Sequence, residues 1–174
     1  MEPEAVDLSI YSADHYLADV WFWKANRTDP VGYADDKTHK LATEKDIDAT
    51  KLKNKSGKTF YLTRKVDTGT SAYTIDLQIE YQGDTLPRYI NRLPSGSRAD
   101  IRAKGHWQEG EWTIEFARAL NTGNRDDVQF EPGNNYLLGV SRYEIAGRPP
   151  NKKLSQPLYG TGDINEVLWL HLNR

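Results

Sequence analysis

The stretch YTIDLQIEY, residues 73–81, alternates apolar and polar side chains along its whole length. A period of two places the apolar side chains on one face of a half-buried β-strand. Three shorter stretches carry strand patterns as well: WTIEF at 112–116, NYLLGV at 135–140 and VLWLHL at 167–172. Clusters of Gly, Pro, Asn and Ser lie between these stretches and favour turns. We therefore predict a chain of short strands joined by turns.

Composition supports the same fold class. Five Trp and ten Tyr against a single Met suit a β-rich chain better than a helical bundle. The predicted fold is an all-β antiparallel β-sandwich of the immunoglobulin-like or carbohydrate-binding-module-like kind. Because 174 residues is the size of one ordinary domain, we expect a single domain over residues 1–174. Residues 37–65 are Lys-rich and weakly periodic, so we expect a long surface excursion there, with one short helix near Glu44.

Charge and cysteine content exclude several classes of protein. A formal net charge of −2 gives no basic field to attract nucleic acid, so we expect no nucleic-acid partner. The chain has no cysteine, which excludes disulfides, thiolate metal sites and the thioether bonds of a c-type haem. No apolar run approaches the roughly 20 residues that span a bilayer, so we expect no membrane insertion.

Catalytic and metal-binding motifs are absent from the sequence. The four histidines have no metal-type spacing, and HExxH, the phosphate-binding loop and GxSxG do not occur, which argues against a hydrolase. Two acidic pairs, Asp35-Asp36 and Asp126-Asp127, are of a kind that can hold calcium in oxygen-rich loops. Acidic pairs more often solvate a loop or form Asx turns, and we favour that interpretation here.

Two tryptophans stand out for their spacing. Trp21 and Trp23 fall on one side of a predicted strand and would form an aromatic wall for a planar ligand such as haem or a sugar ring. Aromatic pairs at strand spacing are mainly packing, so the residues alone favour a role in the core. Both interpretations stay open at this point.

Two long blocks of the chain resemble one known family. DVWFWKANRTDPVGYADD, residues 19–36, is similar to the D-x-W-x-W-K-A-x-R and G-x-A-D-D block of the ethylbenzene dehydrogenase-type haem-binding domains. GHWQEGEWTIEFARALNTG, residues 105–123, resembles the G-x-W-x-x-G-x-W-T-V-x-F-x-R-x-L-x-T strand pair of the same family. The blocks occur in the family's order, and the resemblance runs from about residue 14 to residue 157.

The resemblance implies a β-sandwich of the small-subunit type that binds haem b and transfers electrons without turning over a substrate. It also implies a periplasmic setting and a redox partner, such as a c-type cytochrome or a subunit of an oxidoreductase complex. Because the chain has no cysteine, haem b would be held non-covalently. We therefore expect a binding or electron-transfer module, and no enzyme activity of its own.

The family's axial haem ligands, a methionine and a lysine, are matched here only in part. Lys153, with Lys152 as its neighbour, occupies the place of the lysine, whereas the only methionine is Met1. His15 stands near the place of the missing methionine, and imidazole is a good ligand for haem iron. We expect His15 and Lys153 as the axial candidates, Trp21 and Trp23 as the aromatic wall, and His106 as the reserve ligand or a packing residue.

A departure from the family concerns the residues before the first block. The family domain has strands there, and only about a score of residues precede it here, so we expect the first strands to be missing. An exposed sheet edge invites association, which predicts a dimer or a larger complex. The alternative functions are a carbohydrate- or small-ligand-binding module with a platform of Trp21, Trp23, Trp107 and Trp112, or a structural subunit of a redox complex.

Overall fold

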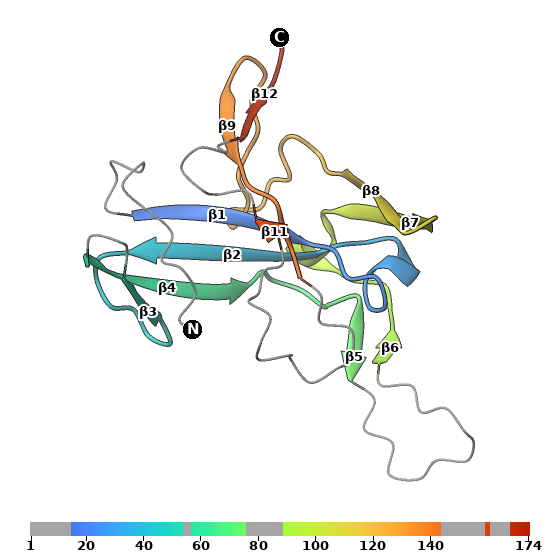
Figure 1. The fold of residues 1–174 in the computed structure, drawn as a ribbon, viewed down its shortest axis with the longest axis horizontal. Coiled ribbons are helices and arrows are strands. Elements are labelled where there is room, and N and C mark those ends of the chain that lie inside the picture. The colour runs from blue at the N-terminus through green and yellow to red at the C-terminus, as the bar shows by residue number, and fades with distance from the viewer. Residues whose placement is uncertain (1–14, 54–56, 76–88, 144–158, 161–167) are drawn as a thin grey trace. The chain divides into compact units, whose positions relative to one another are not determined.

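The computed structural model describes residues 15–53, 57–75, 89–143, 159–160 and 168–174, with the backbone alone described at 15–16 and 159–160. Its strands are β1 (His15–Phe22), β2 (Asp35–Ala42), β3 (Thr50–Lys53), β4 (Thr59–Val66), β5 (Tyr73–Ile75), β6 (Tyr89–Asn91), β7 (Arg102–Gln108), β8 (Glu111–Ala117), β9 (Asn135–Leu138), β10 (Ser141–Arg142), β11 (Tyr159–Gly160) and β12 (Leu168–His171). Two short 3-10 helices, η2 (Asp29–Val31) and η3 (Gly96–Ala99), complete the described elements (Figure 1).

The predicted all-β antiparallel class is confirmed. Strands β3–β4, β5–β6, β7–β8, β9–β12 and β10–β11 all pair antiparallel. The largest sheet has the order β1-β2-β4-β3. In the described residues, no helix is long and apolar enough to cross a membrane. The packing of sheets into a sandwich stays a prediction.

Contacts divide the chain into two compact units. The first contains Met1–Tyr16, Leu41–Thr63 and Phe130–Arg174, and the second contains Leu17–Lys40 and Arg64–Gln129. Strands β1, β2 and β4 contribute residues to both units. The expectation of a single domain stays a prediction.

The strand pattern read from the sequence agrees with the described strands. The predicted strand at 112–116 lies within β8, and those at 135–140 and 167–172 correspond to β9 and β12. The alternating stretch at 73–81 begins as β5, and its remaining residues lie outside the described part.

The expectation of a surface excursion at residues 37–65 is wrong. This stretch holds most of β2 and β4 and all of β3, and the described residues near Glu44 form no helix. In the first unit, Leu41 and Phe60 are buried together, with Leu52 and Leu62 packed against them. Leu52 lies opposite Phe60 in the β3–β4 pair. The many lysines between these few apolar residues obscured a period-two pattern that buries one face.

The core of the second unit forms beside the start of β7, where the Ala34 amide donates to the Ile101 carbonyl oxygen. Ala34, Ile101 and Ala103 are buried there, with Trp21 and Trp23 packed against them. Small residues of β7 leave space for the indole rings. A Cβ atom on Gly105 would lie only 2.4 Å from Cζ2 of Trp23, so this position accepts glycine alone without rearrangement.

A tight turn fixes the register of the β7–β8 hairpin. Gln108 pairs with Glu111, which leaves Glu109 and Gly110 as a two-residue loop. Both loop residues have positive φ, 50° and 90°, as a type I′ turn requires. The turn places Ala103, Gly105 and Trp107 on the same face as Trp112, Ile114 and Phe116.

Candidate functional site

The predicted axial ligands lie at or beyond the limits of the described structure. His15 is the first residue of β1, and its side chain is outside the described part. Lys153 and its neighbour Lys152 lie outside the described residues. Their role as haem ligands therefore stays a prediction.

Trp21 and Trp23 are held by protein contacts. The Trp21 ring lies 6.1 Å from that of Phe116, and the Trp23 ring meets Trp112 edge-on at 5.0 Å between centroids. Trp23 Nε1 also donates a hydrogen bond of 3.1 Å to Oδ1 of Asp29. The structure thus brings both predicted wall residues into the packing of the second unit, where each leaves only part of its ring accessible.

The carboxylate of Asp29 links Trp23 to the β7–β8 hairpin through hydrogen bonds. Its Oδ1 also accepts from the Gly105 amide at 2.6 Å, and its Oδ2 accepts from Lys104 Nζ at 2.9 Å. Burial by itself raises the pKa of Asp29, but the hydrogen bonds from Lys104, Gly105 and Trp23 outweigh it and hold the pKa below its ordinary value.

His106 lies on the other face of the hairpin. It pairs with Thr113, whereas its neighbour Gly105 faces Trp23, and successive side chains of a strand point to opposite faces. With Gln108, Glu109, Glu111 and Thr113, it lines a polar hollow. The structure therefore does not bring His106 together with the predicted aromatic wall.

The apolar face of the hairpin leaves a row of aromatic rings accessible. Trp107 and Trp112 are direct cross-strand partners with ring centroids 5.4 Å apart, and they are 53% and 47% exposed. Phe116 is 42% exposed farther along β8. These rings offer an accessible apolar surface, and Trp112 packs against the partly buried Trp23.

A buried ion group forms around Asp35, the first residue of β2. Lys24 Nζ donates to Oδ2 of Asp35 at 2.6 Å, and Arg98 Nε donates to Oδ1 of the same carboxylate at 3.1 Å. Burial lowers the pKa of Lys24, and its bond to Asp35 only partly offsets this. Burial alone would raise the pKa of Asp35, yet the two cations outweigh burial and lower it. The lysine of the W-K-A-x-R motif thus has a structural role.

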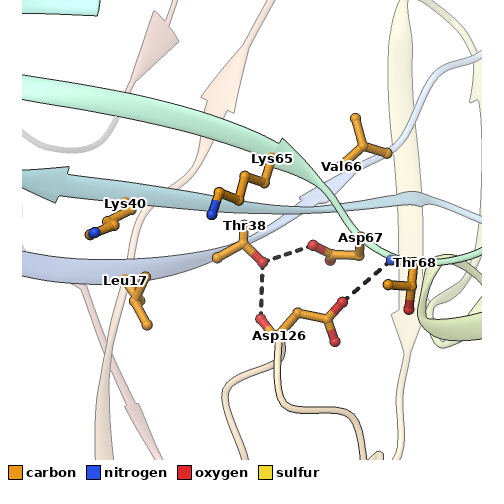
Figure 2. Close-up of a pocket in the computed structure, with 8 residues that line it drawn as sticks. All are labelled: Leu17, Thr38, Lys40, Lys65, Val66, Asp67, Thr68 and Asp126. Carbon is orange, nitrogen blue, oxygen red and sulfur yellow. Dashed lines mark hydrogen bonds between the residues drawn. The ribbon is translucent and has the colours of Figure 1, made fainter. Parts of the chain in front are cut away.

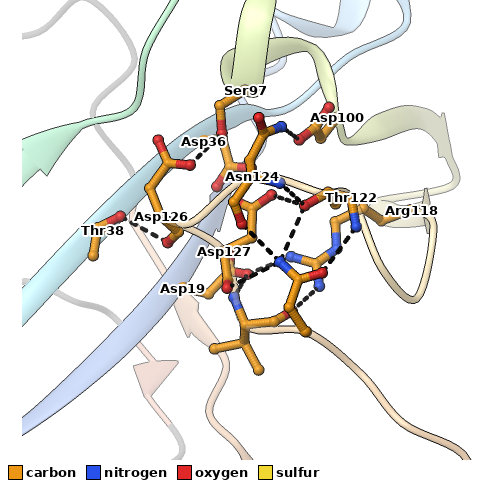
Figure 3. A network of polar contacts seen from close by, with 12 residues as sticks. Asp19, Asp36, Thr38, Ser97, Asp100, Arg118, Thr122, Asn124, Asp126 and Asp127 are labelled. Atoms are coloured by element: carbon orange, nitrogen blue, oxygen red, sulfur yellow. Dashed lines mark hydrogen bonds and ion pairs between the residues drawn. The ribbon is translucent and has the colours of Figure 1, made fainter.

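The second acidic feature is a cluster of carboxylates, which we call the Asp19 cluster. One oxygen each from Asp19 in β1, Asp36 in β2 and Asp127 in the segment after β8 lie within 4.8 Å of one another. Asp36 is fully buried and Asp127 is 8% exposed. Asp67, which is also buried, interacts electrostatically with Asp36. Figure 3 shows Asp19, Asp36 and Asp127 converging with the polar side chains around them.

Mutual repulsion and burial perturb these carboxyl groups. Burial, followed by the charges of Asp19, Asp67 and Asp127, raises the pKa of Asp36 to about 9. Burial is also the main cause that raises the pKa of Asp127 to about 6, and it raises the pKa of Asp67 as well. A proton or a cation is therefore needed to neutralise the cluster near neutral pH.

Beside Asp67 lies a small hollow of about 250 Å³. It is lined by Leu17, Thr38, Lys40, Lys65, Val66, Asp67, Thr68 and Asp126 (Figure 2). Typical small-molecule sites begin at roughly 300 Å³, so this hollow suits water or a small ion better than a cofactor. Neither Trp21 nor Trp23 lines it.

The sequence interpretation of the acidic pairs as solvated loops is wrong. Asp35, Asp36 and Asp127 are buried, and one member of each pair joins the Asp19 cluster. The available signal was the acidic pairs themselves: Asp35-Asp36 begins β2, and Asp126-Asp127 lies in the segment after β8. The sequence could not show that residues so far apart, in β1, β2 and the segment after β8, meet in space.

Comparisons with known proteins agree with the resemblance in the two sequence blocks. The profile of a family described as ethylbenzene dehydrogenase matches residues 2–147, most of the 174-residue chain. Searches of curated proteins and of solved structures gave no match. The matched range covers β1 to β10, and with it the hairpin and the Asp19 cluster. The chain therefore belongs to the ethylbenzene dehydrogenase family.

Proposed function

We propose that this chain is a non-covalent haem b-binding electron-transfer module of the ethylbenzene dehydrogenase small-subunit type. The observation that carries the proposal is the family match over residues 2–147. The absence of cysteine means that any haem is held without thioether bonds. Haem would supply reversible one-electron transfer, and the chain would supply binding, orientation and exclusion of water.

The described residues fit the proposal only in part. They offer an accessible row of aromatic rings at Trp107, Trp112 and Phe116, but His106 lies on the opposite face of the hairpin. We assign the axial positions to His15 and Lys153, because the resemblance places Lys153 at the family's lysine and His15 near the place of its methionine. A lysine that ligates iron must be deprotonated, which requires burial or the metal to lower its pKa.

The proposed setting follows from the family. We infer a periplasmic subunit that acts with an oxidoreductase subunit or a c-type cytochrome and is not itself an enzyme. The accessible aromatic row on β7 and β8 is a suitable contact for such a partner, because aromatic residues are enriched at protein interfaces. A dimer is the simplest alternative association.

A second function is favoured by one observation. The half-exposed Trp107–Trp112 pair resembles the aromatic platforms on which sugar rings stack. A carbohydrate- or small-ligand-binding module without haem would use this surface.

Parallel titrations with haem and with soluble oligosaccharides distinguish the two functions. The proposal predicts a Soret band that persists after desalting, is weakened in His15→Ala and Lys153→Ala, and is unchanged in Lys152→Ala, the matched control. Sugar binding predicts a change in tryptophan fluorescence that Trp107→Ala abolishes, without a Soret band. Saturable sugar binding with no retained haem would overturn the haem proposal.

A further inference from the structure

We propose that the Asp19 cluster is a binding site for one calcium ion, ligated by Asp19, Asp36 and Asp127. The three carboxylates come from separate parts of the second unit, and one oxygen from each lies within 4.8 Å of the others. Two ligands on opposite sides of Ca²⁺ are about 5 Å apart, because Ca–O distances are 2.3–2.6 Å. The spacing therefore allows all three oxygens to bind one ion.

Each carboxylate keeps one oxygen without a hydrogen-bond partner. Oδ1 of Asp19, Oδ2 of Asp36 and Oδ1 of Asp127 are buried from solvent and accept from no N–H or hydroxyl group, and the same holds for Oδ2 of Asp67. A proton shared between Asp36 and Asp67, or between Asp127 and Asp100, is the alternative to an ion. A buried acceptor without a partner costs free energy, and most native acceptors avoid this state. Four such oxygens in one region indicate a binding site for a cation.

The other oxygen of each carboxylate is held by a protein donor. Asp19 Oδ2 accepts from the Val128 amide at 3.1 Å and from Arg118, and Asp36 Oδ1 accepts from the Lys37 amide at 2.9 Å. Asp127 Oδ2 accepts from the Thr122 hydroxyl.

The same pattern extends to Asp67, whose Oδ1 accepts from the Thr38 hydroxyl at 2.7 Å. Metal sites commonly show this division, in which donors around the ligands orient the carboxylates and leave the facing oxygens for the ion.

Charge supports a cation at this position. Arg118 forms an ion pair with Asp19, which accounts for one of the four buried carboxylates. The charges of Asp19, Asp67 and Asp127 all repel the charge of Asp36 when these groups are ionised. A divalent cation would remove this repulsion and satisfy the unpartnered oxygens together.

The donor set selects the class of ion. Every candidate ligand is a carboxylate oxygen, which suits hard cations and disfavours zinc or copper. Mg²⁺ requires a near-octahedral shell with oxygens only about 4 Å apart across the ion, whereas Ca²⁺ accepts wider and less regular shells. Bound calcium would join β1 and β2 to the segment that follows β8, and so hold one end of the hairpin in place.

Isothermal titration calorimetry of the full, chelator-treated chain with CaCl₂ tests the proposal. We expect one saturable site in the wild type and loss of that site in Asp36→Asn and in Asp127→Asn. Asp48→Asn serves as the matched control, because Asp48 is exposed in a turn at φ 60°, which asparagine tolerates, and this variant should bind as the wild type does.

Thermal unfolding gives a second readout that separates a calcium site from a damaged fold. Calcium should raise the Tm of the wild type and leave that of Asp36→Asn unchanged, while the metal-free variant is at least as stable as the metal-free wild type. Absence of saturable binding to the wild type at millimolar calcium would overturn the proposal and indicate shared protons instead. Wild-type affinity in both cluster variants would also overturn it.

Discussion

Replacement of Gly105 by alanine perturbs the contact that fixes Trp23 against the β7–β8 hairpin. The new Cβ would lie 2.4 Å from Cζ2 and 3.0 Å from Cη2 of the Trp23 ring, far inside van der Waals contact. The ring cannot simply withdraw, because Asp29 holds its Nε1 and Trp112 packs against it edge-on. Overpacking of this kind costs about 1–3 kcal/mol. Alanine also lowers the conformational entropy of the unfolded chain, which offsets about 0.4–1 kcal/mol of this cost.

We therefore expect Gly105→Ala to lower the free energy of unfolding by roughly 1–2 kcal/mol, measured by urea denaturation followed by circular dichroism. Trp23→Phe provides the partner for a double-mutant cycle, because phenylalanine lacks the ring atoms that would clash. In the Trp23→Phe background, Gly105→Ala should cost less, with a coupling of about 1 kcal/mol. An equal cost in both backgrounds would refute the proposed clash, as would a single variant within about 0.5 kcal/mol of the wild type.

Three further predictions concern stability. Phe60→Ala should lower the free energy of unfolding, measured by urea titration, by about 3 kcal/mol, because Phe60 is buried with Leu41. If residues 37–65 were a surface excursion, the same substitution would leave the free energy of unfolding almost unchanged. Lys24→Met should cost about 3 kcal/mol, since it leaves the buried Asp35 with Arg98 alone, and a loss below about 1 kcal/mol would contradict the ion group. Because the pKa of Asp29 is lower in the folded state than in the unfolded chain, the ionised carboxylate stabilises the fold. This stabilisation is fully present above the unfolded pKa near 3.8 and is lost as the pH falls through the pKa of the folded state. Asp29→Asn should therefore cost roughly 1–3 kcal/mol at pH 7, and the difference from the wild type should shrink in acid; a pH-independent difference in Tm would contradict this assignment.

Strands in which apolar and polar residues alternate strictly were predictable from the sequence. Strands with few apolar residues among many lysines were not. WTIEF at 112–116 shows its period directly and lies within β8. Strands β3 and β4 bury only a few apolar residues, among them Leu52, Phe60 and Leu62, so the pattern was too sparse to separate from a solvated loop. Local pattern identifies a strand only when enough of one face is apolar.

The candidate sites show a different limit. Trp21 and Trp23 were recognised as a pair from their spacing, yet only the structure shows that Asp29 and Gly105 fix the position of Trp23. The Asp19 cluster depends on contacts between Asp19, Asp36 and Asp127, which are far apart along the chain. Sequence spacing carries no information on such contacts, so the cluster was accessible only through the fold.

The visible absorption spectrum of the full chain, reconstituted with haem b, desalted, and recorded before and after dithionite reduction, tests the central functional claim most directly. We predict one retained haem per chain, with a low-spin spectrum and sharp reduced bands that indicate two axial ligands. A desalted chain without a Soret band would contradict the haem-binding function while leaving its membership of the ethylbenzene dehydrogenase family intact.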